Sequence, residues 1–150
     1  MAEPSPPPPL LSIRVIYEDL PDLIEVETRV NAGPWSGVAT AYTGPEMLRD
    51  AARGLQTWAQ RPTGVFVLEA GADIGIGWLR LRCSSVGGRG AIPCQVDLAT
   101  SSGDPLTAWR LSLVSPVEAW SLEGFARQLE RLAETLEGEA ILAGEAGSPH

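Results

Sequence analysis

The sequence predicts an α+β domain in which a largely antiparallel, strongly curved sheet of six to eight strands carries two amphipathic helices on one face. Several short segments alternate apolar with polar residues, which is typical of strands with one buried face. Two longer segments repeat apolar residues every three or four positions, which is typical of amphipathic helices. Turns rich in glycine and proline separate the strands, and such short connections favour antiparallel neighbours.

The hairpin between Gly75 and Thr100 has the clearest alternation, and its turn contains a glycine-rich segment, Gly87–Gly90. Glycine allows the positive φ angles of a tight turn. Centring the turn on Gly88-Arg89 places the apolar side chains on one face, whereas a slip of one residue would expose them. On the apolar face the predicted cross-strand pairs are Leu79 with Leu98, Leu81 with Val96, and Cys83 with Cys94; on the polar face they are Arg80 with Asp97, and Arg82 with Gln95.

Three strands are predicted near the start of the chain. They follow residues 1–10, a proline-rich segment that we expect to be a disordered tail. The third strand carries small residues at Gly37, Ala39 and Ala41, where another element can approach closely. The three strand segments are Leu11–Tyr17, Leu23–Val30 and Trp35–Tyr42.

Two segments have the apolar spacing of helices. The first begins at Pro45, a residue that suits the first turn of a helix, and its apolar stripe reaches Ala59. The second begins between Pro116 and Ser121 and ends near Leu136. The order along the chain is therefore strands, helix, strands, helix.

The remaining strands complete a domain that we assign to residues 11–143, with a loose tail at residues 144–150. Ser115-Pro116 is expected to end the strand before the second helix. The predicted strands are Val65–Ala70, Ala108–Val114 and a short edge strand within Glu139–Leu142. Turns centred on Ala72-Asp73 and on Gly103-Asp104 pair Phe66 with Leu79, pair Trp109 with Leu98, and place Asp97 between Arg80 and Arg110.

The charge composition limits the class of partner. The chain has 19 acidic and 11 basic residues, which gives a net charge of −8. All 11 basic residues are arginine. An acidic chain without a basic cluster argues against a nucleic-acid or anionic-membrane surface, and it leaves open a basic protein partner. The N-terminus lacks the regions of a signal peptide, and no apolar run of about 18 residues occurs. We therefore expect a cytoplasmic protein with reduced thiols.

The motifs of common enzyme and cofactor sites are missing from the sequence. His150 is the only histidine, and its terminal position argues against a Ser-His-Asp site or a multi-histidine metal site. The glycine-rich segments lie between predicted strands and lack the lysine of a phosphate-binding loop. We therefore expect no enzymatic activity, no cofactor and no metal. Carboxylate pairs such as Glu25 with Glu27, or Asp19 with Asp22, leave a glycosidase-type mechanism as an alternative.

Cys83 and Cys94 are predicted to face each other across the central hairpin. One interpretation is a redox-sensitive or metal-binding pair. The interpretation that we favour is two small buried hydrophobic side chains, because no further Cys or His completes a zinc site.

Two groups of side chains are predicted to contact a partner. The first is acidic and lies at the start of the chain: Asp19, Asp22, Glu25 and Glu27. The second lies on the polar face of the central hairpin: Trp78, Arg80 and Arg82. Tryptophan and arginine are enriched where binding energy concentrates. The alternative for the second group is that arginine simply stacks on a surface tryptophan, or that a helix covers this face.

Four segments together resemble a known family. They are Trp35-x-Gly37, the helix with Leu48 and Leu55, the strand beginning at Ile74, and the late helix with Leu122, Phe125, Ala126, Leu129 and Leu132. From about Val15 to Leu136 this arrangement resembles the small bacterial domains grouped around the WapI-type immunity protein, although the proline-rich start departs from it. The resemblance implies a cytosolic, non-enzymatic protein that neutralises a toxin by binding it. We therefore predict a protein-binding module; the alternative is a small-molecule-binding domain with a pocket between sheet and helices.

Overall fold

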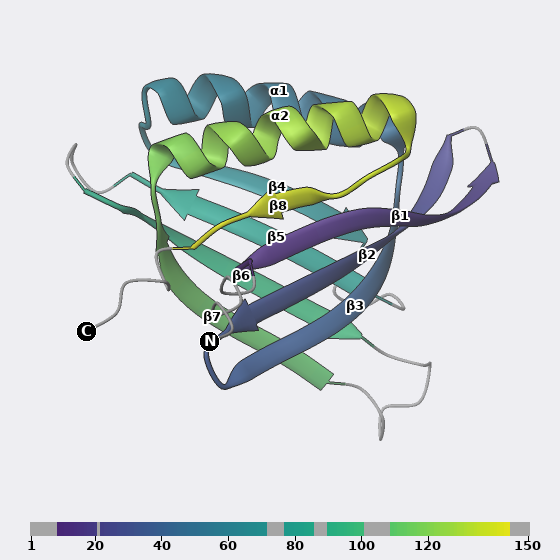
Figure 1. Ribbon diagram of the computed structural model, residues 1–150, viewed down its shortest axis with the longest axis horizontal. Coiled ribbons are helices and arrows are strands. Elements are labelled where there is room, and N and C mark those ends of the chain that lie inside the picture. The colour runs from purple at the N-terminus through teal and green to yellow at the C-terminus, as the bar shows by residue number, and fades with distance from the viewer. Residues whose placement is uncertain (1–8, 21, 72–76, 86–89, 101–108, 145–150) are drawn as a thin grey trace, which may run out of the picture.

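The computed structural model describes residues 9–20, 22–71, 77–85, 90–100 and 109–144. These residues form two helices and eight strands, and the strands pair antiparallel, so the predicted α+β class is confirmed (Figure 1). The strands are β1 (Leu11–Leu20), β2 (Leu23–Ala32), β3 (Trp35–Thr43), β4 (Val65–Gly71), β5 (Gly77–Ser84), β6 (Ile92–Thr100), β7 (Trp109–Val117) and β8 (Ala140–Leu142); the helices are α1 (Pro45–Gln60) and α2 (Ala119–Thr135).

The strands divide between two four-stranded sheets, so the prediction of one strongly curved sheet is wrong. Sheet A has the order β3-β2-β1-β8, and sheet B has the order β4-β5-β6-β7. Helix α1 separates β3 from β4 in the chain, and β8 returns to pair with β1. Alternation along a segment indicates which face of a strand is buried, but it does not indicate which sheet the strand joins.

Strand β3 crosses the inner face of sheet B, and small residues make this crossing possible (Figure 1). A Cβ atom on Gly77 of β5 would overlap the backbone carbonyl of Thr40 in β3. A Cβ atom on Gly37 would lie 3.1 Å from Leu111 of β7, and one on Gly71 would lie 3.1 Å from Ala41. The expected close approach at the small residues of β3 is therefore confirmed.

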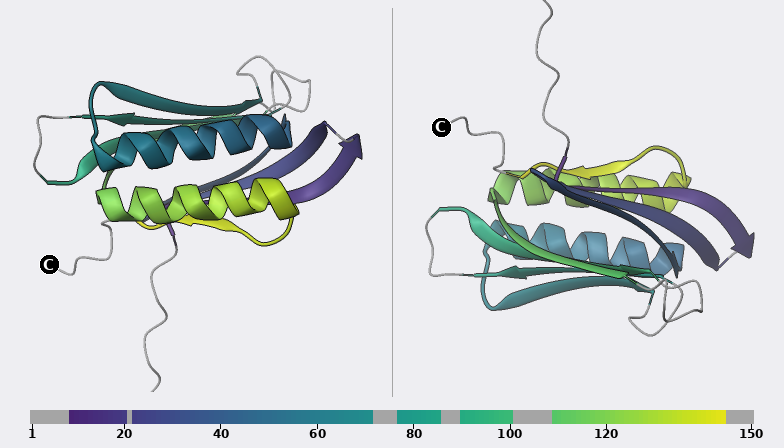
Figure 2. Two further views of the ribbon diagram at one scale, coloured as in Figure 1. Left: turned by 90° about the horizontal axis from the view of Figure 1, so that it is seen from above. Right: turned by 90° about the horizontal axis from the view of Figure 1, so that it is seen from below.

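The two helices lie side by side and cover the space between the two sheets (Figure 2). Helix α2 lies over β8 and β1, and α1 lies next to β4. Pro45 occupies the first turn of α1 as predicted. The apolar stripes of both helices enter one core shared with the two sheets; their buried apolar side chains are Leu48, Ala52, Leu55 and Ala59 from α1, and Leu122, Phe125, Ala126, Leu129, Leu132 and Ala133 from α2.

The register of the central hairpin is confirmed at every predicted pair, from Leu79 with Leu98 to Cys83 with Cys94. The predicted registers of β4 with β5 and of β6 with β7 are wrong, each by an even number of residues. In the structure, Phe66 lies opposite Cys83 rather than Leu79, Leu98 lies opposite Leu111 rather than Trp109, and Ser112 rather than Arg110 lies beside Asp97. An even shift leaves each side chain on its predicted face, so the side chains that face the core and those on the outer face of sheet B are still those predicted.

Two boundaries differ from the predictions for reasons of packing. Strand β7 continues through Pro116 to Val117, because an edge strand tolerates a residue without an N–H group. Leu10, assigned to the tail, is buried in the core, and its carbonyl oxygen accepts a hydrogen bond from the Asn31 N–H. Residues 1–8 of that tail, and residues 145–150, lie outside the described residues. Within the described residues, neither helix is long and apolar enough to cross a membrane.

Candidate interaction surface

A β-bulge in β1 turns Tyr17 onto the outer face of sheet A. Val15 lies opposite Val26 of β2, but Tyr17 lies opposite Glu25, so the register shifts between them. Without this shift, alternation would place Tyr17 on the buried face with Ile13 and Val15. Tyr17 is instead 58% exposed. Because β-bulges often re-aim side chains next to functional sites, Tyr17 is the starting point of the candidate surface.

Tyr17 belongs to a row of three residues across the outer face of sheet A. Glu25 of β2 lies opposite Tyr17 of β1 and opposite Tyr42 of β3. Residues directly opposite one another on neighbouring strands share one face of the sheet. Glu25 is half-buried and Tyr42 is 43% exposed. The row therefore places a carboxylate between two exposed tyrosines.

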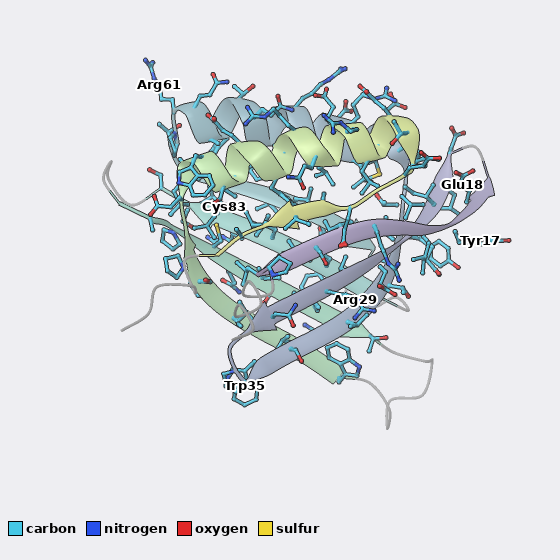
Figure 3. The ribbon with its side chains drawn as sticks, in the orientation of Figure 1. Tyr17, Glu18, Arg29, Trp35, Arg61 and Cys83 are labelled. Atoms are coloured by element: carbon cyan, nitrogen blue, oxygen red, sulfur yellow. The ribbon has the colours of Figure 1, made fainter. Side chains whose placement is uncertain are left out.

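Further carboxylates lie around this row, at the end of the molecule where the β1–β2 hairpin projects (Figure 3). The carbonyl oxygen of Asp22 would lie 3.1 Å from a Cβ atom on Gly44, which places the hairpin beside the start of α1. The end of α2 is at this same end of the molecule (Figures 1 and 2). We define the acidic end as Glu18, Asp22, Glu25, Glu46, Glu137 and Glu139; within the described residues none of them forms an ion pair.

Glu27 lies in the neighbouring row of sheet A, but two arginines neutralise it. Its Oε1 accepts hydrogen bonds from Arg14 Nε at 3.0 Å and from Arg29 Nε at 2.9 Å. The hydrogen bond from Arg14, supported by Arg29, holds the pKa of Glu27 below its usual value, although partial burial acts in the opposite direction. The Glu27 side chain is 15% exposed, whereas both arginine side chains are about half exposed. Glu27 is therefore a paired carboxylate and we leave it out of the acidic end.

We expect Glu27→Gln to lower the free energy of unfolding by no more than about 1 kcal/mol at neutral pH, because both arginine partners remain hydrated. Urea unfolding followed by circular dichroism measures this loss. Arg14→Ala removes only one of the two donors and should cost less than Glu27→Gln. A loss above about 2 kcal/mol for Glu27→Gln would show that this triad is desolvated and would contradict the exposure described above.

The second predicted group lies on the outer face of sheet B, where Trp78 is enclosed by its neighbours. Trp78 is 5% exposed, and its indole N–H donates a hydrogen bond to Glu69 Oε2 of β4. The guanidinium carbons of Arg80 and Arg110 lie 5.2 and 5.4 Å from the centre of the indole ring. This is the geometry of cation–π contacts, so the predicted stacking of arginine on tryptophan is confirmed, whereas the prediction that Trp78 is exposed at the surface is wrong.

Asp97 of β6 connects the polar side chains of this face. Its Oδ2 accepts hydrogen bonds from Arg80 Nε at 3.2 Å and Nη2 at 3.1 Å, and its Oδ1 accepts one from Ser112 Oγ at 2.6 Å. Gln95 Nε2 donates a further hydrogen bond at 3.2 Å. Burial of the carboxylate opposes its ionisation, but the hydrogen bonds from Ser112, Gln95 and Arg80 outweigh this and hold the pKa of Asp97 below its usual value. The carboxylate of Asp97 is thus satisfied within the chain.

The seven residues predicted to contact a partner do not form one surface. Asp22, Glu25 and Glu27 belong to the β1–β2 hairpin, whereas Trp78, Arg80 and Arg82 lie on the outer face of sheet B. The inner faces of both sheets share one core, so the two outer faces point away from each other (Figure 2). Arg82 is exposed opposite Gln95. The side chain of Asp19 lies outside the described residues.

Sequence reasoning missed the two tyrosines of the surface. Tyr42 had a usable signal, because Ala39 and Ala41 mark the inner face of β3 and alternation then places Tyr42 outside. The sequence carries no such signal for Tyr17, since alternation with Ile13 predicts that Tyr17 lies on the buried face, and only the bulge moves it to the outer face.

The cysteine pair lies in the core, away from this surface. Cys83 and Cys94 are directly opposite each other, unbonded and fully buried, as predicted, with their sulfur atoms 3.3 Å apart. In the part of the chain that the structure describes, no three His, Cys, Asp or Glu side chains gather in the manner of a metal site.

Neither protein-family models nor curated protein sequences nor solved structures match this chain.

Proposed function

We propose that this chain is a non-enzymatic protein-binding module of the immunity type, which neutralises a basic toxin by binding it through the acidic end. The observation that carries this proposal is the row formed by Tyr17, Glu25 and Tyr42. Tyrosine contributes a large amphipathic contact area and is enriched among the residues that dominate binding energy. A carboxylate between two such residues combines an apolar anchor with charge complementarity to a cation.

The distribution of charge supports a basic partner. The chain carries a net charge of −8, and the six carboxylates of the acidic end contribute to it without ion pairs in the described residues. Complementary charge accelerates encounter, and salt screens this effect. Met47, in the first turn of α1 beside these carboxylates, is 64% exposed and adds adaptable apolar surface.

The packing of the interior supports a function at the surface rather than in an internal pocket. The space between helices and sheets contains large, fully buried apolar side chains such as Phe125, Leu129 and Leu68. Thr28, a buried polar residue of the inner face, already donates a hydrogen bond to the carbonyl oxygen of Ala39. Small-molecule sites instead need a cavity with a few convergent polar groups.

Two charge-reversal variants test the proposal. Glu18→Arg/Asp22→Arg changes the acidic end, and Glu118→Arg/Glu123→Arg makes the same change in net charge at the opposite end of α2 (Figure 1). Each protein, once its stability has been measured, is used to capture partners from the source cells at low salt. A captured protein is then purified and its association rate is measured against all three chains. We expect the first variant to associate roughly tenfold more slowly at low salt, with the difference shrinking as salt is added.

The aromatic part of the surface has its own matched pair of variants. Tyr17→Ala should accelerate dissociation, whereas Trp120→Ala should not; Trp120 is an even more exposed aromatic residue, in the first turn of α2. Equal association rates for the two charge variants would exclude the acidic end as the interface. A captured partner that is acidic, or that binds independently of salt, would contradict a basic toxin.

A further inference from the structure

The two cysteines of the chain occupy facing positions on neighbouring strands, close enough for a disulfide to form. Cys83 of β5 and Cys94 of β6 are directly opposed in the antiparallel ladder. Directly opposed residues have Cα atoms about 4.5 or 5.5 Å apart, depending on the hydrogen-bonding pattern, and a disulfide accepts roughly 4.4–6.8 Å. Their sulfur atoms already lie 3.3 Å apart, so a shift of roughly 1.2 Å brings them to the bond length of a disulfide, about 2.05 Å.

The same site is closed to reagents in the folded protein. Both thiols are fully buried, and the pair is flanked in its row across sheet B by Phe66 and Ser115. The ring of Phe66 in turn lies 6.3 Å from that of Trp58 in α1. Its hydrogen bonding with Cys94, together with burial, raises the pKa of the Cys83 thiol well above its usual range. A thiol that stays protonated is neither a nucleophile nor a ready target of oxidation.

We propose that Cys83 and Cys94 form a cross-strand disulfide when the chain folds in the presence of a small-molecule disulfide, and that the folded protein then protects whichever redox state it acquired. In the unfolded chain one thiolate attacks a sulfur of oxidised glutathione, forming a mixed disulfide and releasing glutathione thiolate. The second thiolate attacks the protein sulfur of that mixed disulfide and releases a second thiolate. The two cysteines are oxidised, one oxidised glutathione becomes two reduced molecules, and these take up the two thiol protons.

Refolding in glutathione buffers tests this proposal. The full chain, unfolded in urea and reduced, is diluted into buffers with increasing ratios of oxidised to reduced glutathione. Free thiols are then alkylated under denaturing conditions and counted by mass spectrometry. We expect both thiols to disappear together, without bound glutathione, whereas Cys83→Ala and Cys94→Ala chains retain a free thiol or carry one glutathione. The folded reduced chain should resist the same buffers, and its oxidation should accelerate in urea below the unfolding midpoint.

The melting temperature provides a second readout. The bond closes a loop of about a dozen residues, so the oxidised chain should melt roughly 6–12 °C higher than the reduced chain. The Cys83→Ala/Cys94→Ala double variant should melt at the same temperature in both buffers. The proposal is overturned if the refolded wild type keeps two free thiols, or binds two glutathiones, at ratios where the single-cysteine chains form mixed disulfides. It is also overturned if the oxidised chain melts below the reduced chain, or if folded reduced protein oxidises as fast as unfolded protein.

Discussion

Replacing Gly77 with alanine is expected to lower the free energy of unfolding by at least about 3 kcal/mol, or to prevent folding altogether. The added methyl group would overlap the backbone carbonyl of Thr40, where β3 crosses β5. A flexible side chain can move away from an added atom, but a strand carbonyl within a hydrogen-bonded sheet cannot do so without moving β3. The crossing of the two sheets therefore depends on the absence of a side chain at this position.

Gly124→Ala is the matched control for this prediction. Gly124 lies inside α2, and a Cβ atom there would meet nothing within 4 Å. Alanine in an open helical position should raise the free energy of unfolding by about 0.5–1 kcal/mol. Urea unfolding of the two variants and the wild type, followed by circular dichroism, compares them directly. If Gly77→Ala unfolds at the wild-type urea concentration, β3 and β5 are not in the contact described here.

The predictable part of this fold is the part determined by alternation and short connections. The central hairpin is one example, since the register from Leu79–Leu98 to Cys83–Cys94 follows from a single glycine-rich turn. The flanking registers do not follow in this way, because the sequences between Gly71 and Gly77 and between Thr100 and Trp109 each allow more than one position for the turn. The division into two sheets depends on contacts between distant segments, such as Gly37 with Leu111, and a local pattern cannot specify their partners.

The candidate surface was predictable to a smaller extent than the fold. Alternation correctly places Glu25 and Glu27 on the outer face of β2. Whether each carboxylate is free depends on the neighbouring strand, and only the β1–β2 register shows that Arg14 reaches Glu27. The exposure of Tyr17 depends on a bulge that interrupts the alternation, so the pattern predicts the opposite face.

Asp97→Ala is expected to lower the free energy of unfolding by about 2–3 kcal/mol at neutral pH. Asp97 is 6% exposed, and its carboxylate accepts charge-assisted hydrogen bonds from Arg80, Gln95 and Ser112. Without this acceptor, the three donor side chains lose a hydrogen-bond partner on a face that is only partly hydrated, so water replaces it incompletely. The loss stays below the 3–5 kcal/mol of a fully buried ion pair because the Arg80 side chain remains about one-third exposed. Asp97→Asn keeps one acceptor oxygen and should cost less.

Glu130→Ala is the matched control, because Glu130 accepts hydrogen bonds from the same two residue types, Arg53 and Gln56. That pair bridges the two helices at the exposed surface, with the Arg53 side chain largely in solvent. Its removal should therefore cost clearly less than Asp97→Ala. Equal losses for Glu130→Ala and Asp97→Ala in urea unfolding would show that burial of the sheet B network adds nothing to its stability.

The lowered pKa of Asp97 predicts how the contribution of this carboxylate to the free energy of unfolding depends on pH. A carboxyl group whose pKa is lower in the folded state stabilises that state above the unfolded pKa, about 3.9 for aspartate, and the contribution is lost as the pH falls through the folded pKa. The difference in free energy of unfolding between wild type and Asp97→Asn, which cannot titrate at this position, should be constant from about pH 7 to 5 and shrink below about pH 4. Other carboxyl groups titrate in both proteins and cancel from the difference. A difference that grows on acidification would mean that the folded protein binds the Asp97 proton more tightly than the unfolded chain, and that burial outweighs the hydrogen bonds of Ser112, Gln95 and Arg80.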